Sequence, residues 1–232
     1  PKTRTIATAP LPFVIAYRKM FHSAHAALMQ CWDKVAPKVG INPLSLDWHT
    51  MFQEFLSVSA YGIDLDFKGW DYSPDVFYFL CLRHFYCILY EELDPNCTPE
   101  DQQQRQTCYS YLMYFLLIVG NSIHQSTGGV PSGYPGTTPD NSMINFLNMY
   151  YIWKKIMRRV NPRFANLASF LEEVRTATYG DDVYQAITQW ASKWYNGITI
   201  AEEAKLLGFE AQAAEKGADI VAIKPLPQCT FL

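Results

Sequence analysis

The sequence predicts an α+β domain in which a small, largely antiparallel sheet is backed by helices. Three observations lead to this prediction. Short β-prone segments lie on both sides of turn signals, at Gly120-Asn121 and Gly180-Asp181. Longer segments follow Ser/Thr-Pro-Asp/Glu signals, which are typical of helix starts. Finally, 49% of the 232 residues are apolar and only 18% are charged, so the chain can bury a large core and is not expected to be disordered.

In the first half of the chain, the segment Val58–Asp66 is β-prone, ends in acids and predicts a strand. Ser73-Pro74-Asp75 provides an N-cap with proline at the first helical position and predicts a helix to about residue 93. Thr98-Pro99-Glu100 repeats that signal and predicts another helix. Residues 116–126 predict two short strands joined by a turn.

In the second half, a Gly- and Pro-rich loop at 128–136 precedes a long helix that Thr138-Pro139-Asp140 is expected to cap and that runs to about Arg159. The remaining predictions are two strands within 176–184, a helix over 187–195, and a further helix with a Thr199/Glu202 capping box that ends at Gly208.

The net charge of −3 comes from 19 basic and 22 acidic residues and at first argues against a nucleic-acid partner. Its distribution is uneven: residues 1–40 carry +5, 41–100 carry −8, 101–180 carry +3 and 181–232 carry −3. Such blocks are often solvated faces. They also arise when a carboxylate site that binds cations lies between basic surfaces that bind phosphate.

Cysteine usage and hydropathy indicate which kinds of protein and site are not expected. The six cysteines form no C-x-x-C pair, which predicts reduced, mostly buried thiols of a cytosolic protein. His22, His25 and Cys31 lack an evident fourth ligand, so a zinc site is not expected. The longest apolar run, Tyr109–Val119, is too short to span a bilayer and is expected to be core.

Two carboxylate motifs carry the candidate chemistry. Asp66 ends the first predicted strand and Asp71 follows five positions later, a pattern that solvated acids also produce. Tyr179-Gly180-Asp181-Asp182 places adjacent acids at a predicted hairpin turn. Adjacent carboxylates repel, so a bound cation would explain them; a purely structural turn is the alternative.

The third motif is the loop from Gly129 to Thr137, which leads into a helix expected to start near Asn141. Glycines let backbone N–H groups approach a ligand, and hydroxyls at a helix entrance suit a polyol or phosphate. A tight surface loop is the alternative.

The order D-x4-D, SG-x3-T-x3-N and YGDD resembles the palm of the RNA-dependent RNA polymerases of picorna-like positive-strand RNA viruses. The residues that match are Asp66 and Asp71 in the first palm motif, Ser132, Gly133, Thr137 and Asn141 in the second, and Tyr179–Asp182 in the third. Tyr134-Pro135 is bulkier than the small residues often found in the second motif and is expected to stiffen its loop.

The resemblance continues at both ends of the chain. Lys2-Thr3-Arg4 is similar to the end of the basic fingertip motif that grips the incoming triphosphate, and Arg18 lies at a spacing that the family also uses. Lys216 falls where these enzymes place a lysine thought to protonate the leaving pyrophosphate; an exposed lysine in a charged loop is the alternative. Cys229–Leu232 resembles the beginning of the primer-grip strand.

What the resemblance implies is template-directed transfer of ribonucleoside monophosphates from NTPs to an RNA 3′-hydroxyl, for viral RNA replication. Asp66 and Asp181, assisted by Asp182, are expected to bind two Mg²⁺ ions about 3.5–4 Å apart, for which Mn²⁺ can substitute. The expected partners are RNA template and primer, NTPs and the rest of a viral polyprotein.

A reverse transcriptase, which also carries a Y-x-D-D turn, is the main competitor. Reverse transcriptases exclude ribose with a bulky side chain, whereas Asp71, Ser132 and Asn141 are small polar groups able to bond a 2′-hydroxyl. Ribonucleotides are therefore expected. Lys154-Lys155-x-x-Arg158-Arg159 is in helical register and either tracks phosphates or is a solvated helix end.

The expected organisation is that of a polymerase fragment. Residues 1–57 would contain the end of the fingertip motif and helices of the fingers and palm. Residues 58–232 would form the palm, with a fingers insertion around 94–130 and no thumb. An inactive RNA- or nucleotide-binding fragment is therefore the alternative function. The expected location is host cytoplasm, in membrane-associated replication complexes, without a transmembrane segment in this chain.

Overall fold

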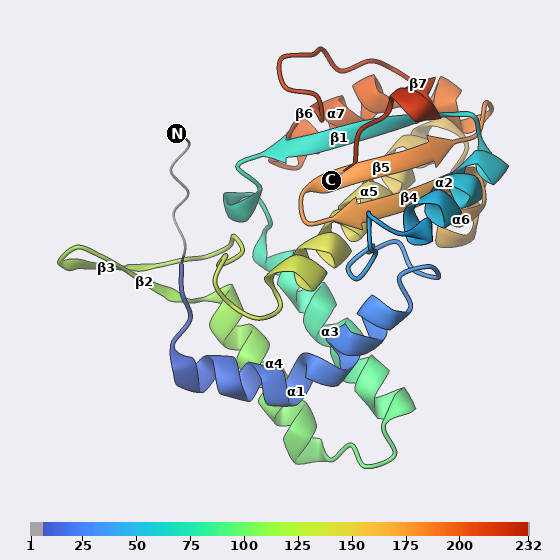
Figure 1. The fold of residues 1–232 in the computed structure, drawn as a ribbon. Helices are drawn as coiled ribbons and strands as arrows, with labels where there is room; N and C mark the ends of the chain where they lie inside the picture. Colours follow the sequence, from blue (N-terminus) through green and yellow to red (C-terminus); the bar gives the residue numbers. More distant parts are fainter. Residues whose placement is uncertain (1–6, 232) are drawn as a thin grey trace.

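A mostly antiparallel sheet organises the molecule, and the computed structural model describes residues 7–231 of it. The strands lie in the order β4-β5-β1-β6, and β7 also pairs with β1 (Figure 1). Their bounds are β1 Tyr61–Lys68, β4 Val174–Tyr179, β5 Asp182–Ile187, β6 Glu210–Ala213 and β7 Lys224–Pro225. Leu65 pairs with Val183 on one side and Ala213 on the other, so β1 lies in the interior of the sheet.

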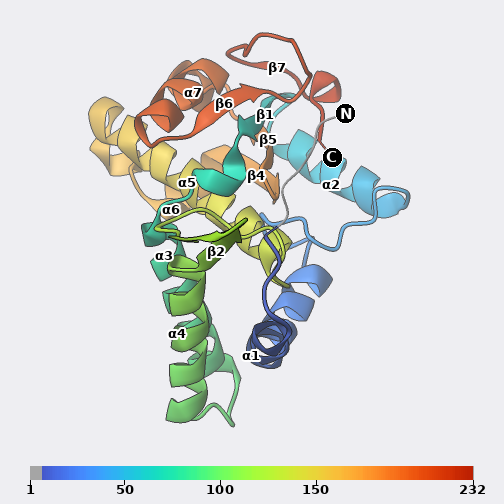
Figure 2. The same cartoon turned by 90° about the vertical axis from the view of Figure 1, so that its left-hand side faces the viewer.

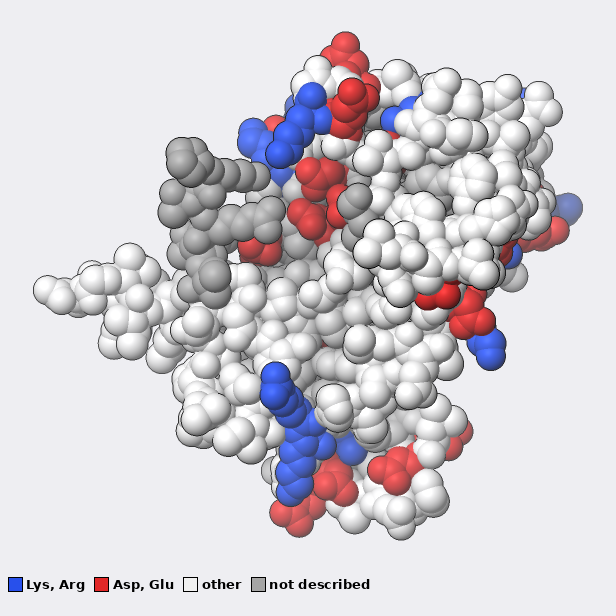
Figure 3. Space-filling view, in the orientation of Figure 1, with Lys and Arg blue, Asp and Glu red and all other residues white. Residues whose placement is uncertain are grey.

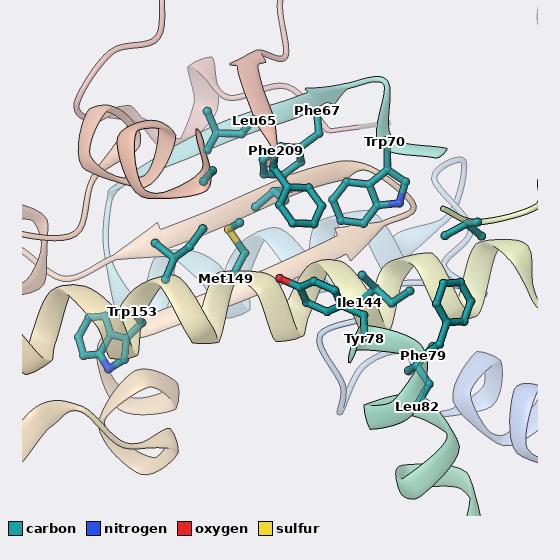
Figure 4. Packing of buried hydrophobic residues seen from close by; sticks show 14 of the residues in the cluster. Leu65, Phe67, Trp70, Tyr78, Phe79, Leu82, Ile144, Met149, Trp153 and Phe209 are labelled. Carbon is teal, nitrogen blue, oxygen red and sulfur yellow. The ribbon is translucent and has the colours of Figure 1, made fainter. Parts of the chain in front are cut away.

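Helices cover both faces of this sheet. The long helix α5 (Thr137–Val160) and α7 (Gly197–Leu206) pack on one face, where Leu65 and Phe67 of β1 belong to the same buried cluster as Ile144 and Met149 of α5, with Phe209 and Trp70 between them (Figure 4). On the other face, α2 (Leu46–Val58) packs through Phe55 against Tyr184 of β5. The short helix α6 (Leu167–Glu173) leads into β4.

A second group of helices lies below the sheet (Figures 1 and 2). It consists of α1 (Leu11–Gln30), α3 (Val76–Leu93) and α4 (Pro99–Met113), and its core is aromatic, with Phe21, Phe79 and Tyr86 fully buried. The hairpin of β2 (Leu116–Val119) and β3 (Ser122–Gln125) projects from this group as a separate two-stranded sheet.

The α+β class is confirmed, and so are several predicted elements. Thr98 caps α4 through a reciprocal capping box with Asp101. The hairpin around Gly120 and the hairpin around Gly180 are both present, with φ of 59° and 61° at these glycines. Gly208 follows α7 at φ 86°. In each case the signal lies in residues that are neighbours in the chain, so the sequence alone is enough to predict the element.

Other helix and strand boundaries differ from those predicted. Val58 ends α2, and β1 starts only at Tyr61. The N-cap of α3 is Asp75, whose side chain accepts from the Phe77 N–H, and not Ser73. Helix α5 begins at Thr137 with Gly136 as its cap, so 138–140 lie inside it.

The helix predicted over 187–195 is wrong. Strand β5 continues to Ile187, which pairs with Val174, and only a short 3-10 helix at Ala191–Lys193 follows. The next capping box is formed by Asn196 and Thr199 in place of Thr199 and Glu202. Cys229–Phe231 follows a 3-10 helix at Leu226–Gln228 and forms no strand, contrary to the primer-grip expectation.

The core and cysteine predictions hold in part. Tyr109, Leu112 and Met113 are buried in α4, but Ile118 and Val119 are exposed on the projecting hairpin. All six cysteines are free thiols, yet Cys108 alone is buried, so the expectation of mostly buried thiols was wrong. Within residues 7–231, no helix combines the length and apolar character that a bilayer crossing requires.

Candidate active site

The candidate active site lies where β1 runs past the β4–β5 turn. Because Leu65 pairs with Val183, the next residue of β1, Asp66, lies beside the start of β5; Asp181 is part of the turn, and Asp182 begins β5. The left-handed φ of 61° at Gly180 makes this tight turn possible. Figure 3 shows acidic side chains gathered in front of these strand ends, with basic side chains beside them.

Hydrogen bonds hold the Asp66 carboxylate in place. Its Oδ1 accepts from the Phe67 N–H at 2.7 Å, and its Oδ2 accepts from the Gln212 amide of β6 at 2.5 Å. The side chain is therefore fixed from within its own strand and from the neighbouring strand.

Electrostatics in this cluster favour bound positive charge. Burial raises the pKa of the Asp181 carboxyl, and the nearby charges of Asp66 and Asp71 raise this pKa further, while a hydrogen bond from its own backbone lowers it. Burial together with the charges of Asp181 and Asp66 raises the pKa of Asp182 to about 6. Carboxyls whose ionised forms are disfavoured by burial and by one another gain stability when a cation arrives.

The glycine-rich loop contacts the segment that carries Asp71. The Val130 N–H donates to the Asp71 carbonyl, and the Gly129 N–H donates to the Pro74 carbonyl, both at 2.8 Å. A Cβ on Gly129, which has φ 80°, would lie 2.6 Å from the Asp71 carbonyl oxygen. Glycine is needed here because the Asp71 backbone lies so close, whereas the sequence predicted glycines that let a ligand approach.

The nucleotide-binding residues predicted in the second motif lie along this loop and the first turns of α5. Ser132 Oγ accepts from the Ala7 N–H at 3.3 Å, and Thr137 Oγ1 donates to the Tyr134 carbonyl at 2.8 Å. A Cβ on Gly133 would lie 2.4 Å from the Ala7 carbonyl oxygen. Asn141 is buried, and its Oδ1 accepts from the Trp70 indole N–H at 2.9 Å, so Asn141 joins α5 to the segment after β1.

The sequence analysis did not predict two residues that hold the turn carrying Asp181. Ser142 Oγ accepts from the Gly180 N–H at 2.9 Å, and Asn145 Nδ2 donates to the carbonyls of Gly180 and Asp181 at 3.0 and 3.1 Å. Both side chains are fully buried. The available signal was a pair of polar residues three apart within an amphipathic helix, a spacing that places both on one face.

The other predicted residues are exposed or lie outside residues 7–231. Lys216 is exposed in the turn after β6, and Arg18 is exposed on α1, which lies away from the sheet in both views (Figures 1 and 2). Lys2 and Arg4 lie outside the described residues.

The basic cluster on α5 is partly engaged within the protein. Lys155 and Arg159 both form ion pairs with the buried Glu203 of α7. For these two residues the observed contacts favour a structural role over phosphate tracking.

The donor set fits a hard divalent cation. Asp66 and Asp181 present carboxylate oxygens, which Mg²⁺ prefers. Among residues 7–231, no three His, Cys, Asp or Glu side chains are gathered closely enough to enclose a metal by themselves. Mg²⁺ is commonly held by one or two carboxylates completed by substrate phosphates and water, so two protein carboxylates suffice.

Comparison with known proteins identifies the class. The family model of viral RNA-dependent RNA polymerases matches residues 1–232. The chain therefore belongs to the viral RNA-dependent RNA polymerases.

Individual relatives agree with this family. The chain is 28% identical to the replicase polyprotein of Cricket paralysis virus and 29% identical to the genome polyprotein of Human hepatitis A virus genotype IIIB. All of this chain is covered, but it spans only 13% and 10% of those polyproteins.

A solved structure shows the same fold. The Sicinivirus 3Dpol RNA dependent RNA polymerase matches with a TM-score of 0.78 at 22% identity, over 100% of this chain and 45% of that one. The chain thus has the fold of part of a polymerase.

Proposed function

We propose that this chain carries the catalytic centre of an RNA-directed RNA polymerase, which transfers ribonucleoside monophosphates from NTPs to an RNA 3′-hydroxyl. The observation that carries the proposal is the meeting of Asp66 with Asp181 in a partly buried cluster where like charges raise the carboxyl pKa. Membership of the viral polymerase family supports the reaction class.

In this proposal Asp66 and Asp181 hold two Mg²⁺ ions, or Mn²⁺ in their place, with Asp182 assisting. Bound there, the ions supply positive charge to the attacking oxygen, the transferred phosphoryl group and the leaving pyrophosphate. The protein contributes by holding the carboxylates: Gln212 fixes Asp66, and Asn145 fixes the turn that carries Asp181.

The nucleotide is assigned to the surrounding residues. Asp71, Ser132 and Asn141 would bond the ribose 2′-hydroxyl, and the Trp70 indole N–H fixes the Asn141 side chain. A site whose polar groups bond that hydroxyl discriminates strongly against deoxynucleotides. Lys2, Arg4 and Arg18 are assigned to the triphosphate and Lys216 to protonation of pyrophosphate; these roles rest on the family resemblance.

The active unit is proposed to be the longer viral protein, in membrane-associated replication complexes of the host cytoplasm, with RNA template and primer as partners. A second function is proposed for the isolated 232-residue chain, which is binding of RNA or nucleotide without turnover. The chain aligns with only 45% of the solved polymerase, and this observation favours the second function for the chain alone.

Primer extension on poly(A) with oligo(U) tests both functions, using the isolated chain and the longer polymerase that contains it. We expect UMP incorporation by the longer protein, and loss of at least about a hundredfold in Asp181→Asn, since a metal-binding carboxylate is removed. Asp33→Asn makes the same chemical change at an exposed residue and should leave incorporation intact. Full activity of Asp181→Asn would refute the assignment.

A further inference from the structure

One buried carboxylate outside the metal-binding cluster has an unusual environment. Asp140, in the first turn of α5, is fully buried and accepts hydrogen bonds from four tyrosine hydroxyls. Oδ2 accepts from Tyr17 of α1 at 2.9 Å, Tyr109 of α4 at 2.9 Å and Tyr134 at 2.8 Å, and Oδ1 accepts from Tyr86 of α3 at 2.9 Å. We call Asp140 and these residues the tyrosine cage.

Among the described residues, the basic group paired with Asp140 is a histidine, which carries a charge only when it is protonated. The nearest basic group is His25, whose Nε2 lies 3.7 Å from Asp140 Oδ1 and 3.1 Å from the Tyr86 hydroxyl. Taking a carboxylate out of water is unfavourable unless hydrogen bonds replace its hydration. Four hydroxyl donors meet that requirement, and each is thereby fixed in position relative to α5.

Only one of the four tyrosines belongs to the glycine-rich loop. Tyr134 follows Ser132 and Gly133 and precedes Thr137, which are the residues assigned to the nucleotide. Its ring meets the Tyr17 ring edge to face, at 5.3 Å between centroids and 88° between planes. Its backbone carbonyl accepts from both the N–H and the hydroxyl of Thr137.

The space around Tyr134 leaves little room for another loop conformation. A Cβ on Gly136 would lie 2.2 Å from the Tyr17 hydroxyl and 2.7 Å from the Tyr134 ring. Tyr134 itself is 4% exposed. The middle of the loop is therefore held by the cage, while its start is held by the bond from Val130 to Asp71.

We propose that the Tyr134–Asp140 hydrogen bond is a latch that positions the Ser132–Thr137 loop and so sets the selection of ribose over deoxyribose. Tyr134 and Asp140 are positioning residues, since they act through Ser132. This inference rests on the proposed polymerase function and adds the determinant of sugar selection. Without the latch, the loop is free to shift, and Ser132 no longer meets the 2′-hydroxyl at a fixed place.

Two matched substitutions test the latch. Tyr134→Phe and Tyr109→Phe each remove one hydroxyl that donates to the same Asp140 oxygen, at 2.8 and 2.9 Å, but only Tyr134 lies on the loop. In the longer polymerase, kcat and KM for UTP and dUTP are measured with oligo(U) on poly(A). We expect Tyr134→Phe to lower the UTP/dUTP preference on the order of tenfold, as for one hydrogen bond of about 1.4 kcal/mol, mainly through KM for UTP. Tyr109→Phe should keep the preference.

Hydrogen exchange of the amides in residues 128–137 gives a readout that does not need activity. Tyr134→Phe should speed exchange across this loop, whereas Tyr109→Phe should leave the loop protected although both variants melt at similarly lowered temperatures. Equal loop exchange in the two variants, or an unchanged UTP/dUTP preference in Tyr134→Phe, would overturn the latch. Absence of UMP incorporation by the unaltered polymerase would instead refute the proposed function, and the exchange data would still decide the latch.

Discussion

Ser142→Ala tests how firmly α5 holds the turn that carries Asp181. Ser142 Oγ makes two hydrogen bonds: it donates to the Thr138 carbonyl at 2.7 Å and accepts from the Gly180 N–H at 2.9 Å. The substitution removes both while keeping the helix and changing little volume. The first bond is a local bond to the preceding turn, and the second joins residues far apart in the chain.

The two contributions can be separated by a matched control. Ser110 of α4 makes the same kind of local bond, from its Oγ to the Gln106 carbonyl at 2.9 Å, but is exposed. A local bond of this kind adds little to helix stability. Ser110→Ala should therefore change the free energy of unfolding by less than about 0.5 kcal/mol.

The hydrogen bond to Gly180 determines how much stability Ser142→Ala should lose. Leaving a buried N–H without its partner costs about 1–3 kcal/mol. Gly180 is only partly buried, and water can replace some of the lost bonding, so we expect a loss of about 1–2 kcal/mol. In a domain of this size such a loss lowers the melting temperature by roughly 2–8 °C.

Urea unfolding followed by tryptophan fluorescence, in EDTA, measures both variants. UMP incorporation by the longer polymerase should fall with Ser142→Ala, because the turn is less well fixed, and should not change with Ser110→Ala. A loss for Ser142→Ala no larger than that for Ser110→Ala would refute the conclusion that this bond holds the turn.

Two further predictions concern buried or partly buried acids. The pKa of Asp182 is raised to about 6 from 3.8, so its ionised form opposes folding above that pH, and the free energy of unfolding in EDTA should rise as the pH falls from 7 toward 4. Asp182→Asn should raise the free energy of unfolding at pH 7 by up to about 1 kcal/mol, after allowance for solvent screening. An unchanged pH dependence of urea unfolding in this variant would contradict the prediction. Asp64 is buried, forms an ion pair with Lys224 Nζ at 2.7 Å and accepts a hydrogen bond from the Thr230 N–H at 2.6 Å, so Asp64→Asn should speed hydrogen exchange over residues 224–231. The control Glu210→Gln removes an exposed ion pair with Lys68 and should leave this exchange unchanged. Equal exchange in the two variants would contradict the role of Asp64.

Local signals explain which parts of the fold the sequence predicted. The capping box of α4 and the Gly180 turn depend on residues that are neighbours in the chain, and both are present. The helix predicted over 187–195 is absent because its first residue, Ile187, pairs with Val174 across the sheet. Local sequence patterns do not reveal such a contact. Helices were expected within residues 1–57, but the bounds of α1 were not predicted, because its cap residue, Pro10, makes no side-chain cap hydrogen bond.

The same distinction applies to the site. Asp66 and Asp181 could be chosen as candidates from the sequence because a strand end and a tight turn are visible in it. Ser142 and Asn145, which hold that turn, act across 35 to 38 residues of chain, and spacing alone does not show such contacts. Asp140 was expected to be a helix-capping residue, but the structure buries it among tyrosines from α1, α3 and α4 as well as the loop.

Helix geometry explains how the start of α5 serves all of these tasks. Successive residues of an α-helix point about 100° apart, so three consecutive side chains must face three different directions. Asp140 meets the tyrosine cage, Asn141 meets Trp70 after β1, and Ser142 meets the Gly180 turn. Asn145 lies one turn beyond Ser142 on the same face and bonds the same turn. Since a shift of one residue would rotate all three contacts away together, the first turns of α5 tie the loop, the β1 end and the carboxylate turn into one arrangement.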